Sequence, residues 1–174
     1  NDGYWKRIPG ISFYTPTEII DIENEGNKAV IYSSHKPIPH RGETTNATLI
    51  MTEIFSPLPD VIGVRHIHWL GDKEKSPQFK LNMDSDIDID VTLGKRCVEL
   101  TSGSTRVLIN DENGWTMSFY NKDRLLTNST RKNMGYIVQS DCGKSYMKEQ
   151  LSIGAGEYVY GFGERFTNFT KNGQ

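Results

Sequence analysis

Cysteine, long apolar runs and an excess of charge of one sign are all missing from this sequence of 174 residues. Its two cysteines, Cys97 and Cys142, are too few for a disulfide scaffold, so we expect buried thiols; a single bridge between them stays open. No run of about 18 apolar residues occurs, so no membrane-spanning helix is expected. The 20 basic and 22 acidic residues leave a net charge of −2, which argues against nucleic acid as a partner because phosphate binding requires a concentrated positive surface.

Signals for targeting and for catalysis are equally scarce. The first residues, Asn1–Trp5, contain no charged-then-apolar signal segment. No Ser/His/Asp or Cys/His arrangement stands out among four histidines, and the many carboxylates lie at positions that alternate with apolar residues, as solvated side chains do. We therefore assign no catalytic residue to this chain.

What the sequence does contain is apolar alternation with a period of two along almost its whole length. Such alternation places one face of a strand on a core and the other on water. Short turn signals such as Asn24–Gly26, Ser102–Gly103 and Asn110–Gly114 separate the segments, which favours antiparallel hairpins over parallel strands with helical crossovers. We predict one all-β domain over residues 1–174, a large antiparallel β-sandwich of about ten strands. The predicted strands cover residues 17–23, 28–33, 47–55, 61–69, 85–93, 97–101, 105–109, 115–120, 135–139 and 157–160.

The acidic run Asp84–Asp90 resembles a calcium-binding loop in its spacing of aspartates. An EF-hand loop needs glycine at its sixth position and glutamate at its twelfth. Counted from Asp84, these positions hold Ile89 and Lys95. We expect a strand instead, with its aspartates on the wet face and four apolar residues facing inward: Ile87, Ile89, Val91 and Leu93.

His66 and His68 lie two residues apart, so a strand would place both imidazoles on one face, a spacing that can hold zinc or iron. A cupin-type site would also need a nearby glutamate and a later histidine. Glu74 lies in a polar loop, and no histidine follows His68. We therefore interpret both histidines as packed or solvated side chains. We predict no metal and no cofactor. A cupin-like metalloenzyme is the weakest of the functional hypotheses.

The run Gly161-Phe-Gly163 resembles a phosphate-binding glycine loop only in part. The dinucleotide fingerprint needs a third glycine where this chain has Phe166, at the start of a helix within a βαβ unit that is not predicted here. A tight turn is the simpler interpretation.

The segment around this turn carries a resemblance. Gly156-Glu-Tyr-Val-Tyr-Gly-Phe-Gly-Glu-Arg-Phe166, followed by Lys171-Asn-Gly-Gln174, resembles a motif of glycoside hydrolase family 31, in particular of its bacterial α-xylosidases. Weaker matches occur in the expected order along the chain: Asp2–Trp5 with Pro9-Gly10, Phe55–Pro57 with Val61–Arg65, and Asn133–Tyr136. The resemblance thus covers essentially the whole chain. It implies the N-terminal, galactose mutarotase-like β-sandwich (a supersandwich) of such an enzyme.

The resemblance places the chemistry elsewhere. In the family, two catalytic aspartates on a (β/α)₈ barrel carry out a retaining double displacement, which requires carboxyl groups about 5 Å apart. A barrel takes about 250 residues, so it is expected downstream of this chain and absent from it. The chain would then be a non-catalytic domain, inactive alone, of an α-xylosidase or α-glucosidase that hydrolyses terminal α-xylosides. The sugar specificity lies mostly on the barrel.

The resemblance implies that the C-terminal segment of this chain contributes to binding, although not to catalysis. Phe166 and Phe169 are candidates for an apolar wall beside a sugar ring. Arg165, Asn172 and Gln174 are candidates for hydrogen bonds to hydroxyl groups or for contacts with the barrel. Docking on the barrel alone, through Glu164 and Arg165, is the alternative for the segment. The resemblance also implies a cytoplasmic bacterial enzyme and a homo-oligomeric full-length protein.

A stand-alone carbohydrate-binding module remains the second functional hypothesis. Trp5, Trp69 and Trp115 could stack on sugar rings, because aromatic platforms suit their apolar faces. The competing interpretation is that Trp69 and Trp115, which lie on alternating strands, belong to the core.

Overall fold

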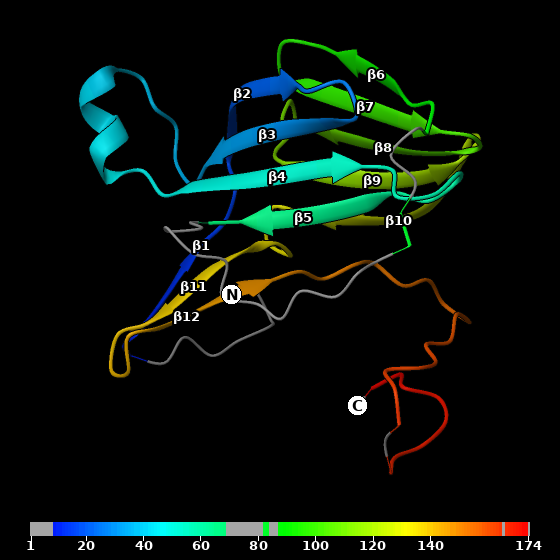
Figure 1. The fold of residues 1–174 in the computed structure, drawn as a ribbon. Coiled ribbons are helices and arrows are strands. Elements are labelled where there is room, and N and C mark those ends of the chain that lie inside the picture. The colour runs from blue at the N-terminus through cyan, green and yellow to red at the C-terminus, as the bar shows by residue number, and fades with distance from the viewer. Residues whose placement is uncertain (1–8, 69–81, 84–86, 165, 174) are drawn as a thin grey trace.

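The computed structural model describes residues 9–68, 82–83, 87–164 and 166–173 (Figure 1). The described residues form twelve strands and one short 3₁₀ helix, η1 (Arg41–Asn46), which projects from the connection between β3 and β4. The strands are β1 (Ile11–Tyr14), β2 (Glu18–Asn24), β3 (Lys28–Ser34), β4 (Leu49–Phe55), β5 (Gly63–Ile67), β6 (Asp90–Leu93), β7 (Cys97–Ser102), β8 (Thr105–Asn110), β9 (Thr116–Asn121), β10 (Arg124–Thr130), β11 (Gly135–Gln139) and β12 (Lys144–Lys148). Within the described ranges, no helix has the length and apolar character to cross a membrane.

The strands pair antiparallel in three sheets. A four-stranded sheet has the order β2-β3-β4-β5, and a five-stranded sheet has the order β10-β9-β8-β7-β6. A small sheet, β1-β11-β12, lies beside these two (Figure 1). The predicted all-β antiparallel sandwich is therefore confirmed.

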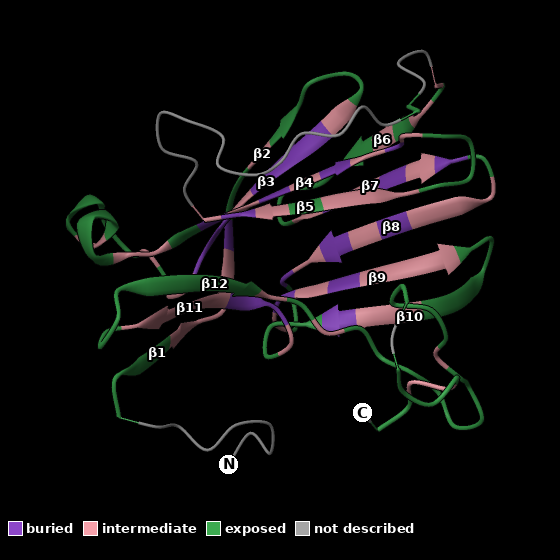
Figure 2. Ribbon diagram, turned by 60° about the horizontal axis from the view of Figure 1, so that its bottom comes forward, coloured by how far each residue is buried: buried purple, intermediate pink, exposed green. Residues whose placement is uncertain are grey.

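The core lies between the two larger sheets, and both sheets contribute buried residues to it (Figure 2). The four-stranded sheet contributes Ile19, Ala29, Ile31, Ile50 and Ile54. The five-stranded sheet contributes Val98, Leu100, Val107, Ile109 and Met117, and Trp115 and Met134 complete the cluster from flanking turns. Close packing of this kind makes the cluster the main source of stability, because truncating a fully buried aliphatic side chain costs about 2–5 kcal/mol.

Several sequence-based expectations need correction. Residues 157–160 form no strand, because their backbone groups bond to a loop rather than to a neighbouring strand. The strands β1, β10 and β12 were not predicted. In β10 the adjacent residues Leu125 and Leu126 are both exposed, so no alternation marks the strand.

The cysteines and two of the four predicted inward positions also differ from expectation. Both thiols are free: Cys97 is half-buried, and Cys142 is exposed because it lies in the turn between β11 and β12. Ile89 and Val91 pack against the core as predicted. Leu93 does not and is exposed, because it ends the edge strand β6. Ile87 lies before β6 and lines a surface pocket instead of the core.

A buried carboxylate ties the two larger sheets together at one end. Asp111, just after β8, accepts a hydrogen bond of 2.6 Å from the backbone N–H of Ile19 in β2. Arg96, in the turn before β7, donates to both carboxylate oxygens, each over 2.7 Å. This bidentate pair raises the pKa of the Arg96 guanidinium, which therefore stays charged. Asp111 thus satisfies three donors from two sheets.

Replacing Asp111 by asparagine should lower the free energy of unfolding by about 2–3 kcal/mol, because hydrogen bonds to a charged group are lost and an amide N–H₂ then faces donors. Urea denaturation followed by circular dichroism measures this. The exposed neighbour Glu112 provides the matched control, and Glu112→Gln should change stability by less than about 0.5 kcal/mol. Equal losses in both variants would contradict a structural role for Asp111.

A second carboxylate joins the loop after β4 to the turn between β7 and β8. Asp60 accepts hydrogen bonds from the Ser104 backbone N–H (2.6 Å) and hydroxyl (2.7 Å). These two bonds hold the pKa of Asp60 below its ordinary value. Gly103 permits the contact: it has a φ of 57°, and a Cβ there would lie 2.5 Å from Asp60 Oδ1.

The Asp60 contact predicts a pH dependence. A pKa lowered on folding stabilises the native state above the unfolded-state value of about 3.9, and this contribution is lost as the pH falls through the lower folded-state pKa. Wild type should therefore be more stable than Asp60→Asn at pH values near neutral, with the difference shrinking under strongly acidic conditions. Asp123→Asn, at an exposed turn position, controls for the change in net charge. Urea titrations across the acid range test this, and a difference independent of pH would contradict it.

Candidate functional site

The segment that follows β12 contains the residues singled out from the sequence. In its described part it forms no strand; it passes beside β10 and then leaves the sheets (Figure 1). Ser152 attaches it to that edge strand: the Ser152 N–H donates to Asn128 O over 2.8 Å, and the Asn128 N–H donates to Ser152 Oγ over 3.0 Å. The Thr127 hydroxyl also donates to Ser152 O, over 2.7 Å. The segment therefore begins from a fixed point on the five-stranded sheet.

Beyond this point Asn172 closes a loop. Its Oδ1 accepts the Val159 N–H over 2.8 Å, and its Nδ2 donates to Glu157 O over 2.9 Å. The Lys171 N–H donates to Val159 O over 2.7 Å. These bonds use the backbone groups that a neighbouring strand would have used. The Asn172 side chain, predicted to contact a sugar or the barrel, thus has a structural task within the segment.

The described residues of the closed loop are mostly exposed (Figure 2), and several of them are aromatic. Phe166 is fully exposed and Phe169 is 81% exposed. The Phe169 ring lies 5.1 Å from the Tyr160 ring, centroid to centroid. The segment's exposed large apolar residues are Leu151, Ile153, Tyr158, Tyr160, Phe162, Phe166 and Phe169. The Tyr160 ring also lies 6.4 Å from the Tyr158 ring, so three exposed rings are neighbours. Exposed apolar patches are typical of surfaces that bind other molecules.

The predicted tight turn lies at the start of the loop. Gly161, Phe162 and Gly163 all have positive φ, of 98°, 65° and 73°. Glu164 follows the turn and is exposed. Arg165 and Gln174 lie outside the described residues. The roles predicted for Glu164, Arg165, Phe166, Phe169, Asn172 and Gln174 remain predictions.

Tyr158 and Tyr160 were not proposed as site residues, although both belong to the exposed aromatic surface. A signal was present in the sequence, because Tyr158, Tyr160 and Phe162 alternate along Gly156–Gly163. That pattern suggested a strand with one buried face. Exposure of the alternating residues could not be read from it.

The histidines considered for a metal site have other partners. His66 Nδ1 lies 3.0 Å from Thr52 Oγ1, and His66 Nε2 lies 3.1 Å from Glu149 Oε2. His68 stacks on Tyr136 of β11, with ring centroids 3.6 Å apart. The contacts with Glu149 and Tyr136 link the four-stranded sheet to β11 and to the residue that follows β12. No group of three or more potential metal ligands occurs among the residues that the structure describes.

Two other sequence-based alternatives fall partly outside the described ranges. Trp115 is buried in the core, so it offers no platform to a sugar. Trp5 and Trp69 lie outside the described residues, as does the part of the acidic run from Asp84 to Asp86. Asp88 and Asp90 are exposed, as predicted, but β6 begins only at Asp90. Residues 87–89 of the predicted strand 85–93 therefore lie outside a strand.

Comparisons with known proteins agree on one family. Residues 51–174 match the model of the glycosyl hydrolase 31 N-terminal galactose mutarotase-like domain. The chain is 33% identical over 173 residues to the α-xylosidase XylQ of Lactiplantibacillus pentosus, covering 99% of this chain and 22% of that protein. It is 32% identical over 155 residues to an α-xylosidase of Emericella nidulans, covering 78% of this chain and 20% of that protein. The chain therefore spans about a fifth of these relatives.

Solved structures share the fold at low identity. A cycloalternan-forming enzyme from Listeria monocytogenes, solved with a pentasaccharide substrate, has a TM-score of 0.63 and 14% identity. An uncharacterised protein from Listeria monocytogenes EGD-e gives the same values. Each match covers 94% of this chain and 14% of the other chain. This likeness supports the fold alone.

Removing the Asn172 amide should open the loop without unfolding the sandwich. In Asn172→Ala the Val159 amide should exchange with solvent up to about tenfold faster, because a hydrogen bond contributes about 0.5–1.5 kcal/mol. Hydrogen exchange by NMR measures this, and thermal unfolding should be unchanged. Asn168→Ala is the matched control, because Asn168 bonds Lys171 through its backbone oxygen. Exchange at Val159 that is the same in both variants would contradict the assigned role of Asn172.

Proposed function

This chain belongs to the glycosyl hydrolase 31 N-terminal galactose mutarotase-like domains, and we propose that it is the non-catalytic β-sandwich of a retaining α-xylosidase. The observation that carries the proposal is the alignment of 99% of the chain, at 33% identity, with only 22% of an α-xylosidase. A catalytic (β/α)₈ barrel downstream would hold the two reacting carboxylates. The chain alone would then not hydrolyse glycosides.

The exposed aromatic segment is the part of the chain that we assign to the barrel and the substrate. A docked barrel would cover apolar side chains that now face water, and interfaces between domains typically bury about 600–1,500 Å². Phe166 and Phe169 project from a loop that Asn172 holds closed, so their rings are available as an apolar wall at the mouth of the active site. Glu164, Arg165 and Gln174 would supply polar contacts to the barrel or to sugar hydroxyls.

Asn172 has a different place in this proposal. Its amide already bonds the backbone at Glu157 and Val159. Asn172 therefore acts as a positioning residue, which holds the aromatic loop, rather than as a direct sugar ligand.

The test compares this chain with a longer protein that carries its own downstream barrel, on p-nitrophenyl α-xyloside and α-glucoside. Only the longer protein should hydrolyse, with preference for the xyloside. In the longer protein, the double change Phe166→Ala and Phe169→Ala should reduce kcat/KM about tenfold, which corresponds to about 1.4 kcal/mol of transition-state stabilisation.

Tyr146→Ala, at an exposed aromatic position on β12, serves as the control and should leave kcat/KM unchanged. If the double variant loses activity without a change in thermal stability, the effect arises at the aromatic loop and not from unfolding. Absence of α-glycoside hydrolysis by the longer protein would overturn the proposal, and a stand-alone carbohydrate-binding module would take its place.

A further inference from the structure

A pocket of about 310 Å³ lies on the outward face of the four-stranded sheet, away from the core. Its wall includes Lys28, Glu53, Phe55 and Arg65, with Met83 and Ile87 from the segment before β6. The C-terminal segment attaches elsewhere, at the edge strand β10 of the five-stranded sheet. The pocket is therefore separate from the aromatic surface assigned above, and sequence reasoning gave no sign of it.

Strand register gathers the polar groups of this pocket. Glu53 of β4 pairs with Arg65 of β5 on one side, and Lys28 on β3 pairs with Phe55, two residues further along β4. Because alternate residues share a face, Lys28, Glu53, Phe55 and Arg65 all point outward. Ile54, between Glu53 and Phe55, points into the core.

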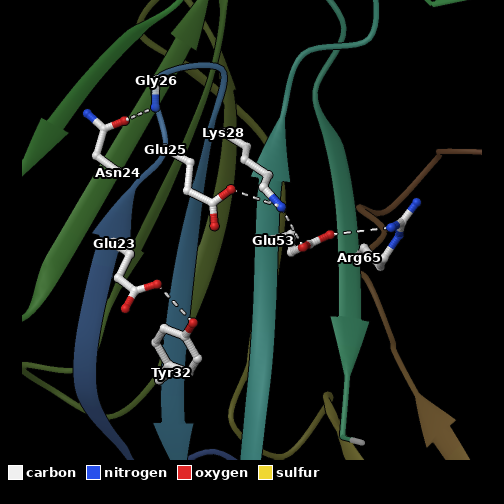
Figure 3. A network of polar contacts seen from close by, with 8 residues as sticks. All are labelled: Glu23, Asn24, Glu25, Gly26, Lys28, Tyr32, Glu53 and Arg65. Carbon is white, nitrogen blue, oxygen red and sulfur yellow. Dashed lines mark hydrogen bonds and ion pairs between the residues drawn. The ribbon is translucent and has the colours of Figure 1, made fainter. Parts of the chain in front are cut away.

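The Glu53 carboxylate lies between two cations (Figure 3). Lys28 Nζ is 2.9 Å from Glu53 Oε1, and Arg65 Nη1 is 3.5 Å from Glu53 Oε2. Lys28 Nζ also lies 3.3 Å from Glu25 Oε2. The hydrogen bond to Glu53 raises the pKa of Lys28, so the ammonium group stays charged. The Glu53 side chain is only 12% exposed, which keeps the carboxylate in one position.

An aromatic ring stands beside these charges. Phe55 pairs with Gly63 across β4 and β5, and a Cβ at Gly63 would lie 2.6 Å from Phe55 Cε2 and Cζ. The ring therefore occupies the space above Gly63 that any other residue would fill. The absence of a side chain at position 63 is what allows the ring to lie along the wall of the pocket.

We propose that this pocket is a second carbohydrate-binding site, for one or two units of a neutral saccharide. A sugar ring offers an apolar face to Phe55, hydroxyl donors to the Glu53 carboxylate, and hydroxyl acceptors to Arg65 and Lys28. Two cations and two carboxylates balance within the cluster, so neither an anionic nor a cationic ligand gains a net attraction. The volume is at the lower end of the range for small-molecule sites, about 300–1,000 Å³.

Only the choice of saccharide rests on the proposed function; the pocket and its chemistry do not. A domain that presents sugar to its own barrel gains from a second attachment point on the same polymer, because linked sites raise the effective concentration. The competing interpretation is an ion-pair network that only stabilises the sheet, and does so weakly because exposed pairs are screened by solvent. The two interpretations differ in whether sugar binds.

The test titrates the isotope-labelled 174-residue chain with methyl α-D-xylopyranoside and, separately, with maltotriose, by ¹H–¹⁵N NMR. We expect saturable shifts of the Gly63 and Ser56 amides, with a Kd on the order of 1–10 mM for at least one of the two. Arg65→Ala should weaken this binding about tenfold through the loss of a charged hydrogen-bond donor. The Arg65 side chain is 61% exposed, so this variant should retain the fold.

Phe55→Leu is the second variant, because it keeps apolar volume and removes the ring; it should weaken binding about fivefold while thermal unfolding reports on the fold. Arg124→Ala, at an exposed arginine on the other large sheet, is the matched control and should bind as wild type. Pocket amides that do not shift with either saccharide would overturn the inference, as would binding unchanged in both Arg65→Ala and Phe55→Leu.

The NMR titration and the hydrolysis assay can fail independently of each other. Hydrolysis by the longer protein without pocket shifts overturns this inference alone. Pocket shifts without any hydrolysis support this inference and overturn the assignment to an α-xylosidase.

Discussion

The apolar layer between the four-stranded and five-stranded sheets is the constraint on which the rest of the molecule depends. Each sheet has one apolar face, and both faces are removed from water only when the sheets pack on each other. Ile31 and Leu100, both fully buried, come from opposite sides of this layer. Asp111 then fixes one end of the layer, because its carboxylate bonds Ile19 of one sheet and Arg96 beside the other.

A packed sandwich leaves its outer surfaces free for other uses. On one side, Ser152 attaches the C-terminal segment to β10 and Asn172 closes its loop, so aromatic rings stand in water at a defined place. On the other side, the outward face of the four-stranded sheet brings Glu53 and Phe55 together on one strand. Both surfaces use the same principle: a rigid sheet positions side chains that the core does not need.

Two histidines that could bind a metal instead contact the small sheet and the residue after it. His66 and His68 have the spacing of metal ligands, yet His66 contacts Thr52 and Glu149, and His68 stacks on Tyr136. The contacts with Glu149 and Tyr136 join β5 and the residue after it to β11 and to the residue after β12. A histidine pair on a strand thus gains its role from what the neighbouring sheet presents to it.

The sequence by itself determined the all-β class, most of the strands and the family resemblance, because burial of one face imposes a period of two that can be read locally. Ile89 and Val91 face the core as that period predicts. The tertiary structure alone decided that residues 157–160 are not a strand, since Glu157 and Val159 bond to Asn172 and Lys171 instead of to a strand. It alone formed β10 despite its exposed leucines, and it alone joined Asp111 to Ile19 and Glu53 to Arg65. Periodicity is a property of consecutive residues, whereas a hydrogen-bond partner from a distant strand is fixed only when the sheets assemble.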